Sequence, residues 1–315
     1  MAININNDSM IQDEPVLEPV NDFSLQNAND AASQASTKGQ GSTAHGLSAE
    51  EQTDPNKIIV TIADKSTPII VLFGPPSCGK TMTLVRMTRY LRSEGYTVQP
   101  IRTFRPTADS HYSEMCQNFD SMINSSDAAR STNRISFMLV MVMKKGKPIC
   151  QILEAPGEYY FNPDDPFKQF PTYIHSIITG DNRKIWSIFV EPDWNDLTPR
   201  MNYVTKIGKL KSQLNPTDKV LFVYNKVDTT EYVISPGNVK LNLIQKNIED
   251  LYPNIFTFFE NQNPITKFFT KYNCDLVPFQ TGYYNELSMT GLTYNEGPKP
   301  YAQALWNKWL KLING

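Results

Sequence analysis

The sequence predicts a three-layer α/β fold, in which helices cover both faces of a mostly parallel sheet that carries one antiparallel hairpin strand. Three patterns support this. A glycine loop stands between an apolar run and a helical stretch, two apolar runs are joined by a short polar turn, and further apolar runs alternate with amphipathic stretches. Ligands of such folds bind at the carboxyl ends of the parallel strands.

The glycine loop is the first of these patterns. Residues 74–81 satisfy the phosphate-binding pattern G-x-x-x-x-G-K-[ST], and an apolar run, residues 69–73, precedes them. Such a loop points its backbone N–H groups at phosphate oxygens, and the helix that follows adds partial positive charge. We expect Lys80 to reach the β- and γ-phosphates, where it also serves catalysis, and the Thr81 hydroxyl to bind Mg²⁺. The expected phosphate-binding residues are Gly74, Pro75, Ser77, Cys78, Gly79, Lys80 and Thr81.

A second motif indicates which base is bound. The apolar run 219–224 ends in Asn225-Lys226-Val227-Asp228. Guanine carries two neighbouring donors, N1–H and N2–H₂, and one carboxylate accepts from both, whereas adenine offers no such pair. We expect Asp228 to bind guanine in this way, Asn225 to join this loop to the phosphate loop, and the stem of Lys226 to lie against the purine.

A third element lies between these two motifs. The apolar runs 135–143 and 148–153 flank a polar turn that contains a glycine, which predicts a β-hairpin. The second strand ends in Glu154-Ala155-Pro156-Gly157. We expect Glu154 to hold a water of the Mg²⁺ shell and the Gly157 N–H to reach the γ-phosphate.

In this order, the three motifs resemble the translation-factor and Ras-like (TRAFAC) class of P-loop GTPases, bacterial-type, over roughly residues 58–283. The resemblance implies the P-loop NTPase fold, GTP and GDP as ligands, Mg²⁺, a molecular switch that hydrolyses GTP, and a protein effector or companion GTPase as partner. Thr281, in the stretch 279–282, resembles the weak fifth element that touches the guanine edge.

Two features depart from that class. Its usual Asp-x-x-Gly is Glu154-x-x-Gly157 here, and Glu158 stands where many members have a water-orienting Gln. Glu158 is therefore expected either to polarise water as a general base or to repel the γ-phosphate and slow hydrolysis.

The threonine of the first switch loop is harder to locate. The segment 103–133 is long and polar, and it offers Thr132 by position, then Thr107, and also Thr103, as a Mg²⁺ ligand. Four arginines in or beside this segment are candidates for a cis arginine finger, and they are Arg102, Arg105, Arg130 and Arg134.

Charge divides the chain into two parts. Residues 1–56 hold nine acidic residues and one basic residue, a net charge of −8, so residues 57–315 carry +6 of the total −2. We expect 1–56 to be a disordered acidic tail and 57–315 to be the GTPase domain, with an enlarged first switch region and an insertion around 229–273. The basic excess is dispersed and no nucleic-acid-binding motif stands out, so we expect no nucleic-acid partner.

Other patterns bear on location and chemistry. No apolar run approaches the length of a membrane span, and no secretory signal is visible, so a cytoplasmic location is expected. The four cysteines have no paired spacing and are expected to be reduced. Cys78 is expected to be a small side chain of the loop, with a lowered pKa as the alternative. A strand is predicted over 184–190, and helices are predicted over 201–214, 241–251 and 301–312.

Three functions compete on the sequence. A GTPase that cycles between two states fits the motifs best, and Glu158 keeps open a GTP-binding scaffold that hydrolyses little. An ATP-dependent phosphotransferase would share the phosphate loop, but Asp228 argues against it.

Overall fold

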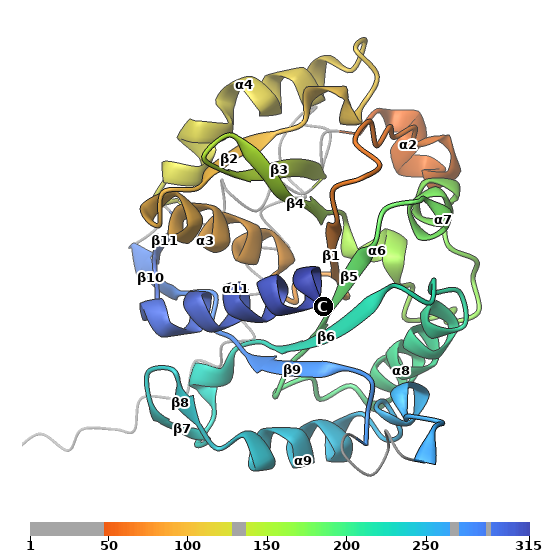
Figure 1. Cartoon of the computed structure of the whole chain (residues 1–315), viewed down its shortest axis with the longest axis vertical. Helices are drawn as coiled ribbons and strands as arrows, with labels where there is room; N and C mark the ends of the chain where they lie inside the picture. The colour runs from red at the N-terminus through yellow and green to blue at the C-terminus, as the bar shows by residue number, and fades with distance from the viewer. Residues whose placement is uncertain (1–46, 128–136, 265–270, 288–290) are drawn as a thin grey trace, which may run out of the picture. The chain divides into compact units, whose positions relative to one another are not determined.

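The computed structural model describes residues 47–127, 137–264, 271–287 and 291–315. All of these belong to one compact unit, Gly41–Gly315. Its centre is a seven-stranded sheet with the order β2-β3-β4-β1-β5-β6-β9 (Figure 1). The strands of this sheet are β1 Ile69–Phe73, β2 Thr97–Pro100, β3 Met138–Lys144, β4 Lys147–Glu154, β5 Lys184–Val190, β6 Lys219–Tyr224 and β9 Asp275–Pro278.

The remaining elements surround this sheet. The longer helices are α3 Lys80–Ser93, α4 Ser110–Asn124, α7 Thr172–Thr179, α8 Leu197–Lys211, α9 Leu241–Leu251 and α11 Lys299–Asn314. Two short helices are α2 Ala49–Thr53 and α6 Gly157–Tyr160, and the 3-10 turns are η3 Pro55–Lys57, η4 Arg102–Phe104, η5 Val227–Thr229 and η6 Thr257–Phe259. Two small hairpins are formed by β7 Val233–Ser235 with β8 Asn238–Val239, and by β10 Tyr283–Leu287 with β11 Gly291–Asn295.

Strand direction matches the predicted sheet. The strands β4, β1, β5, β6 and β9 pair in parallel, and β3 runs antiparallel to both β2 and β4. Every residue of β1 and β5 is buried, as expected for central strands covered on both faces. The turn between β3 and β4 uses Lys145 and Gly146, both at positive φ, which suits a tight hairpin.

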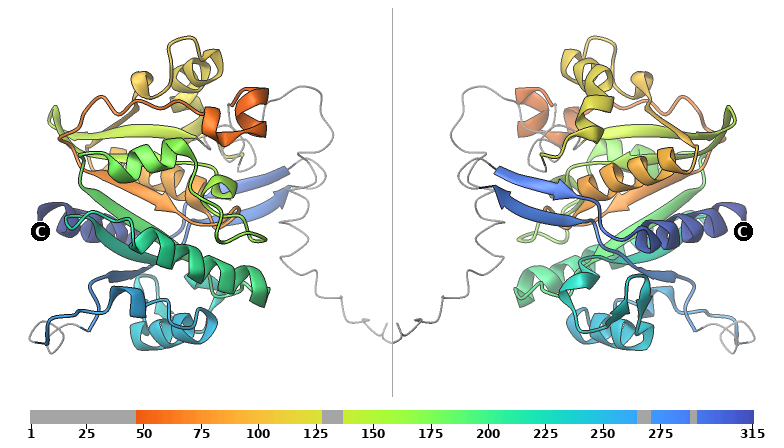
Figure 2. Two further views of the ribbon diagram at one scale, coloured as in Figure 1. Left: turned by 90° about the vertical axis from the view of Figure 1, so that its right-hand side faces the viewer. Right: turned by 90° about the vertical axis from the view of Figure 1, so that its left-hand side faces the viewer.

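Helices cover both faces of the sheet. Figure 2 shows α7 and α8 over one face and α3 and α11 over the other. The helix α11 packs on α3, β5 and β9, and the buried Trp309 Nε1 donates to Ser187 Oγ of β5 at 2.9 Å. The predicted three-layer architecture is therefore confirmed.

Several elements were not predicted, among them α7, the two small hairpins, β2 and α4. The strand β2 pairs with β3 at the edge of the sheet, and α4 fills much of the segment 103–133 that reads as a polar loop. The buried face of α4 carries an apolar stripe, which comprises Tyr112, Met115, Cys116, Phe119, Met122 and Ile123. The segment expected as an enlarged first switch region thus contains a folded helix.

The expected tail boundary at residue 56 needs correction. Residues 49–53 form the helix α2, which begins with a capping box between Ser48 and Glu51, and Leu47 is fully buried. The Arg105 guanidinium, 3 % exposed, pairs with Glu51 Oε1 at 2.6 Å and Asp109 Oδ2 at 2.8 Å. Residues 1–46 lie outside the described part of the chain.

The segment expected as an insertion, 229–273, holds β7, β8, α9 and η6. Phe256 and Phe259 pack on Phe222 of β6 with ring centroids 5.0 and 5.5 Å apart, so these two aromatics belong to the core. Phe258 is 36 % exposed, and Phe268 and Phe269 fall outside the described residues. No described helix combines the length and apolar character that crossing a bilayer requires.

Arg105→Ala should lower the free energy of unfolding by about 3–5 kcal/mol, because it leaves two part-buried carboxylates without their cation. Urea unfolding followed by tryptophan fluorescence measures this change. The matched control is Arg102→Ala, an exposed arginine of the same segment, which should change stability by about 0.5 kcal/mol or less. Equal effects of the two substitutions would contradict the role given to Arg105.

Candidate functional site

Loops at one edge of the sheet carry the predicted motifs. Because β1, β4, β5, β6 and β9 are parallel, their carboxyl ends meet at the same edge. The phosphate loop follows β1, Glu154 closes β4, Glu191 follows β5, Asn225 follows β6 and Phe279 follows β9. The register pairs Leu72 with Glu154 and Tyr224 with Pro278, so none of these ends is staggered far from its neighbour.

The phosphate loop has the backbone that the motif requires. Ser77 and Gly79 adopt positive φ values of 63° and 90°, and α3 begins at Lys80. Pro75 and Pro76 have no N–H, so the donors of this loop begin at Ser77. The Lys80 side chain is buried, and its amine donates to the carbonyls of Gly74 at 3.0 Å and Pro75 at 2.8 Å.

A direct hydrogen bond joins the phosphate loop to the loop after β6, as the sequence predicts for Asn225. Asn225 Nδ2 donates to the Cys78 carbonyl at 2.9 Å, and Asn225 is buried. Gly79 lies against this amide and against Thr281, so that a Cβ there would stand 2.4 Å from Asn225 Nδ2 and 3.2 Å from Thr281 Cγ2. The three loops therefore meet at Gly79.

Lys226 is fixed at both ends. Its backbone is left-handed, with φ 57°, and its amine pairs with Glu191 Oε1 at 3.1 Å and Asp193 Oδ1 at 3.6 Å. Burial lowers the pKa of Lys226, but the two carboxylates outweigh it and the pKa is raised.

Asp228 lies in η5, next to Lys226 and the stretch 279–281. Burial raises the pKa of its carboxyl. Its own backbone N–H and the Gln280 side chain act in the opposite direction, and so do the charges of Arg86 and Lys226. Thr281 is buried, and Tyr284 Oη donates to its hydroxyl at 3.2 Å while Tyr294 Oη donates to its carbonyl at 2.8 Å.

Thr81 and Glu154 form the expected oxygen pair for a cation. The Thr81 hydroxyl donates to Glu154 Oε1 at 3.0 Å, and Glu154 Oε2 is buried with no hydrogen-bond partner among the described residues. Burial raises the pKa of Glu154 to about 8, although Lys80 and Thr81 act to lower it. A hydroxyl and a carboxylate are hard oxygen ligands of the kind Mg²⁺ takes when phosphates and water complete its shell, so this pair fits the ion.

No cluster of three or more His, Cys, Asp or Glu side chains able to hold a metal occurs within the described ranges. A cation here would therefore depend on ligands from a bound phosphate. Of the candidate switch threonines, Thr132 lies outside the described residues, Thr103 lies in η4, and Thr107 is exposed in the turn before α4.

Gly157 begins α6 directly against the phosphate loop. A Cβ on this residue would stand 2.4 Å from Pro76 N, 2.5 Å from the Pro75 carbonyl carbon and 2.7 Å from Lys80 Nζ. Only glycine allows this approach. Glu158 follows as an exposed residue, and its charge acts to raise the pKa of Glu154, so the two carboxylates lie near one another.

The structure argues against two alternatives that the sequence left open. Cys78 has no lowered pKa, because complete burial raises it to about 11 and outweighs the charge of Lys80. Its place in the core near Phe189 and Tyr203 makes it a packing residue. Arg105 is no candidate arginine finger, since its guanidinium is buried in the ion pairs with Glu51 and Asp109. All four cysteines are unpaired, as expected.

Two residues of this site, Glu191 and Arg86, were not predicted from the sequence, and Gln280 was expected only as part of the stretch 279–282. Glu191 directly follows an apolar strand, so the rule that strands deliver their carboxyl ends to one edge was sufficient to find it. Arg86 is almost fully buried, and its guanidinium donates to the carbonyls of Gln280 and Pro298. Nothing in the helical pattern distinguishes Arg86 from Arg89 and Arg92, which follow it on α3.

Gly79→Ala should destabilise the protein more than Gly146→Ala. Both glycines have positive φ, where a Cβ costs about 1–2 kcal/mol. A Cβ on Gly146 would meet no atom of the described residues within 4 Å, whereas one on Gly79 would meet the Asn225 amide. The first substitution should therefore cost about 1–3 kcal/mol more, from overpacking. Urea unfolding of both variants measures the difference, and equal losses would show that the three loops do not meet as described.

Comparison with known proteins identifies no family. No protein-family model and no curated protein matches the chain. Among solved structures, it is similar to nucleolar GTP-binding protein 1 of Plasmodium falciparum, with a TM-score of 0.40 and 13 % identity over 81 % of this chain and 90 % of that one. It is also similar to the GTP-bound Ski7 GTPase-like domain of S. cerevisiae, with a TM-score of 0.41 and 13 % identity over 84 % of this chain and 53 % of that one.

A third similar structure is translation elongation factor SelB of Methanococcus maripaludis in complex with the GTP analogue GppNHp, with a TM-score of 0.33 and 11 % identity. The match covers 81 % of this chain and 35 % of SelB, so the chain spans about a third of that protein. Likenesses at these TM-scores carry no functional argument. We therefore infer the function from the geometry of the site.

Proposed function

We propose that this protein binds GTP and GDP with Mg²⁺ and hydrolyses GTP to GDP and phosphate as a molecular switch. The observation that supports this best is the hydrogen bond from Asn225 Nδ2 to the Cys78 carbonyl, 2.9 Å long and buried. It holds the predicted phosphate loop and the predicted base loop in contact. One nucleotide can then reach Lys80 with its phosphates and Asp228 with its base.

At the phosphate end, the N–H groups from Ser77 onward and the amine of Lys80 supply positive charge. The Lys80 amine donates hydrogen bonds to the carbonyls of Gly74 and Pro75, which hold it beside the loop. Thr81 and Glu154 would hold Mg²⁺, which when bound neutralises charge on the β- and γ-phosphates.

At the base end, the Asp228 carboxylate would accept from N1–H and N2–H₂ of guanine. The carboxylate must be ionised to accept both hydrogen bonds, and the neighbouring Lys226 and Arg86 favour that state. Adenine would leave the carboxylate facing an acceptor at N1, which explains the proposed preference for guanine.

Hydrolysis requires a positioned water, and Gly157 and Glu158 are the residues proposed to act on it. Gly157 lies close to the Pro75–Pro76 peptide of the phosphate loop, and its backbone N–H would reach the γ-phosphate from there. Glu158 would accept a proton from the water as general base. The negative charge of Glu158 would also repel the γ-phosphate and slow hydrolysis, so a GTP-binding scaffold with little hydrolysis is the second candidate.

Titration calorimetry of the full chain with GTP, GDP and ATP in MgCl₂, followed by phosphate release from GTP, tests the proposal. Micromolar or tighter GTP and GDP binding, with weaker ATP binding and measurable phosphate release, supports a GTPase. Binding without phosphate release supports the scaffold. Preference for ATP would overturn the assignment of the base loop.

We further propose that a protein effector or companion GTPase binds this protein according to which nucleotide it holds. Co-purification in the GTP-bound and GDP-bound states would test this.

Lys80→Ala should weaken GTP and GDP binding about 100-fold or more, because each hydrogen bond to a charged group is worth about 1.5–3 kcal/mol and Lys80 is placed to make two. Calorimetry measures the loss. Lys147→Ala removes an exposed lysine at the start of β4, far along the strand from Glu154, and should leave both affinities unchanged. Normal binding by the Lys80 variant would refute the phosphate loop.

Asp228→Asn should reverse base preference from guanine toward xanthine. The amide offers a donor where guanine also presents one, whereas xanthine presents a carbonyl there, so we expect GDP binding to fall about 100-fold and XDP binding to rise above it. Competition between GDP and XDP for a fluorescent nucleotide measures the preference. Asp250→Asn, an exposed acid of α9, is the control. Unchanged guanine affinity would remove Asp228 from the base site.

A further inference from the structure

Arg86 is a buried cation on the helix that carries the phosphate-binding residues. It follows Lys80 by six residues on α3, and only 1 % of its surface is exposed. Burial lowers the pKa of its guanidinium, because a charged group loses favourable hydration when it is buried. A buried charge is stable only where neighbouring groups supply hydrogen bonds or opposite charge.

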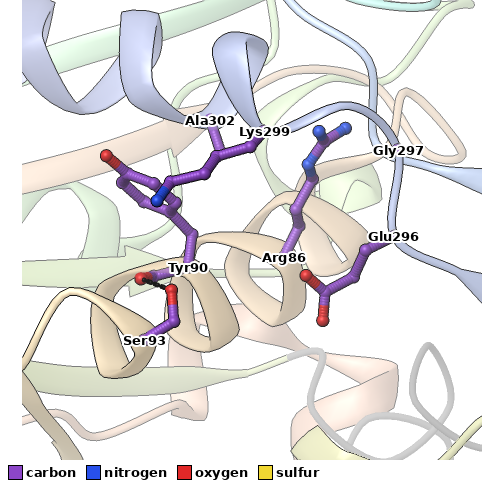
Figure 3. A pocket seen from close by; sticks show the side chains of 7 residues that line it. All are labelled: Arg86, Tyr90, Ser93, Glu296, Gly297, Lys299 and Ala302. Carbon is purple, nitrogen blue, oxygen red and sulfur yellow. Dashed lines mark hydrogen bonds between the residues drawn. The ribbon is translucent and has the colours of Figure 1, made fainter.

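The compensating contacts all come from the segments beyond β9. Arg86 Nη1 donates to the Gln280 carbonyl, Nη2 donates to the Pro298 carbonyl at 2.6 Å, and the guanidinium lies 5.3 Å from the centre of the Phe279 ring. Figure 3 shows the side chain rising from α3 toward the segment at Gly297, beside a cavity of about 100 Å³ at the start of α11. Arg86 thus fixes both residues that precede Thr281.

Arg86 also acts on Asp228 through its charge. Asp228 is among the groups that favour the charged guanidinium, and Arg86 in turn is among those that lower the pKa of the Asp228 carboxyl. Tyr284, Tyr294 and Glu296 are the other groups that face Arg86. The buried Arg86 guanidinium therefore contacts the backbone of the 279–281 loop, and its charge favours the ionised form of the Asp228 carboxyl.

We propose that Arg86 is a positioning residue for purine recognition, which holds the loop Phe279–Thr281 in place and favours the acceptor form of Asp228 from the same helix that binds phosphate. This inference rests on the proposed guanine-nucleotide site. It assigns to α3 a function at both ends of the ligand: Lys80 and Thr81 at the phosphates, and Arg86 behind the base.

Arg89 provides a matched control. It lies on the same helix, and it too donates to two backbone carbonyls, those of Ile123 and Ser125, both at 2.6 Å. It also lies over an aromatic ring, 5.0 Å from the centre of Tyr294. Its carbonyls belong to the end of α4, however, and not to the 279–281 loop. The two arginines therefore differ chiefly in which loop they hold.

The experiment compares Arg86→Met, Arg86→Lys, Arg89→Met and Arg89→Lys with the unaltered protein. Affinities for GDP and IDP are measured by calorimetry, and folding is checked by circular dichroism and thermal unfolding. IDP lacks the N2 amino group but keeps N1–H, so the GDP-to-IDP affinity ratio reports the hydrogen bond from N2 to Asp228 and not the phosphate contacts. The unaltered protein should favour GDP by about tenfold or more, the value of one hydrogen bond to a charged group.

We expect Arg86→Met to lower that ratio to about threefold or less while Arg89→Met retains it, because only the first removes the charge and the support behind Asp228. Arg86→Lys keeps the charge and should restore most of the ratio. A purely structural role would weaken GDP and IDP equally and leave the ratio unchanged. An unchanged ratio in Arg86→Met, or an equal fall in Arg89→Met, would overturn the proposal.

If Arg86→Met does not fold, the two lysine variants decide. A lysine cannot reach both carbonyls, so Arg86→Lys should bind GDP at least about threefold more weakly than Arg89→Lys, and equal affinities would overturn the proposal. Failure of the proposed function has a different signature. The unaltered protein would then bind neither nucleotide or would prefer ADP, before any variant is compared.

Discussion

The structure depends on a constraint that is simpler than any of its motifs: parallel strands end together. Five neighbouring strands run in one direction, so the chain must place five unrelated loops along a single edge of the sheet. The strands β1 and β5 are fully buried, and apart from Lys184 and Ser187 their residues are apolar, so burial stabilises that arrangement. The polar residues that follow those strands are then brought together, and the sheet does not need contacts among these residues in order to fold.

Proximity alone does not make a binding site, and the contacts at Gly79 supply the precision. A buried amide of Asn225 and the methyl of Thr281 both approach this glycine, whose φ is left-handed, so a side chain cannot be accommodated there. The result is a rigid junction between the loops that would hold phosphate and base. Glu191, Tyr252 and Lys226 extend it: the Tyr252 hydroxyl bonds the backbone of Glu191, whose carboxylate fixes the Lys226 amine. The positions of these loops are therefore determined by the residues packed against them and not by the loop sequences themselves.

Much of this was predictable, and the failures have identifiable causes. The strand 184–190, the helix 241–251 and the β3–β4 hairpin follow from apolar periodicity, because their burial is uniform along one face or both. The edge strand β2 buries only Val98 completely, so its four residues carry almost no pattern. The apolar residues of α4 recur at helical spacing, but the many polar residues between them led to the prediction of a polar loop. The nearby charge of Lys80 suggested a lowered pKa as an alternative for Cys78, and this alternative fails because burial, which sequence neighbours do not reveal, has the larger effect on its pKa.

The ion pair between Arg105 and Glu51 has a consequence for the limits of the folded unit. Glu51 both caps α2 and neutralises a cation that is otherwise enclosed between Asp109, the Ile59 carbonyl and Phe137. Shortening the chain to its first sheet strand would strip away one of the two carboxylates and open the surface that Leu47 covers. The folded part of this protein thus starts no later than Leu47, well before the glycine loop that is the first recognisable motif.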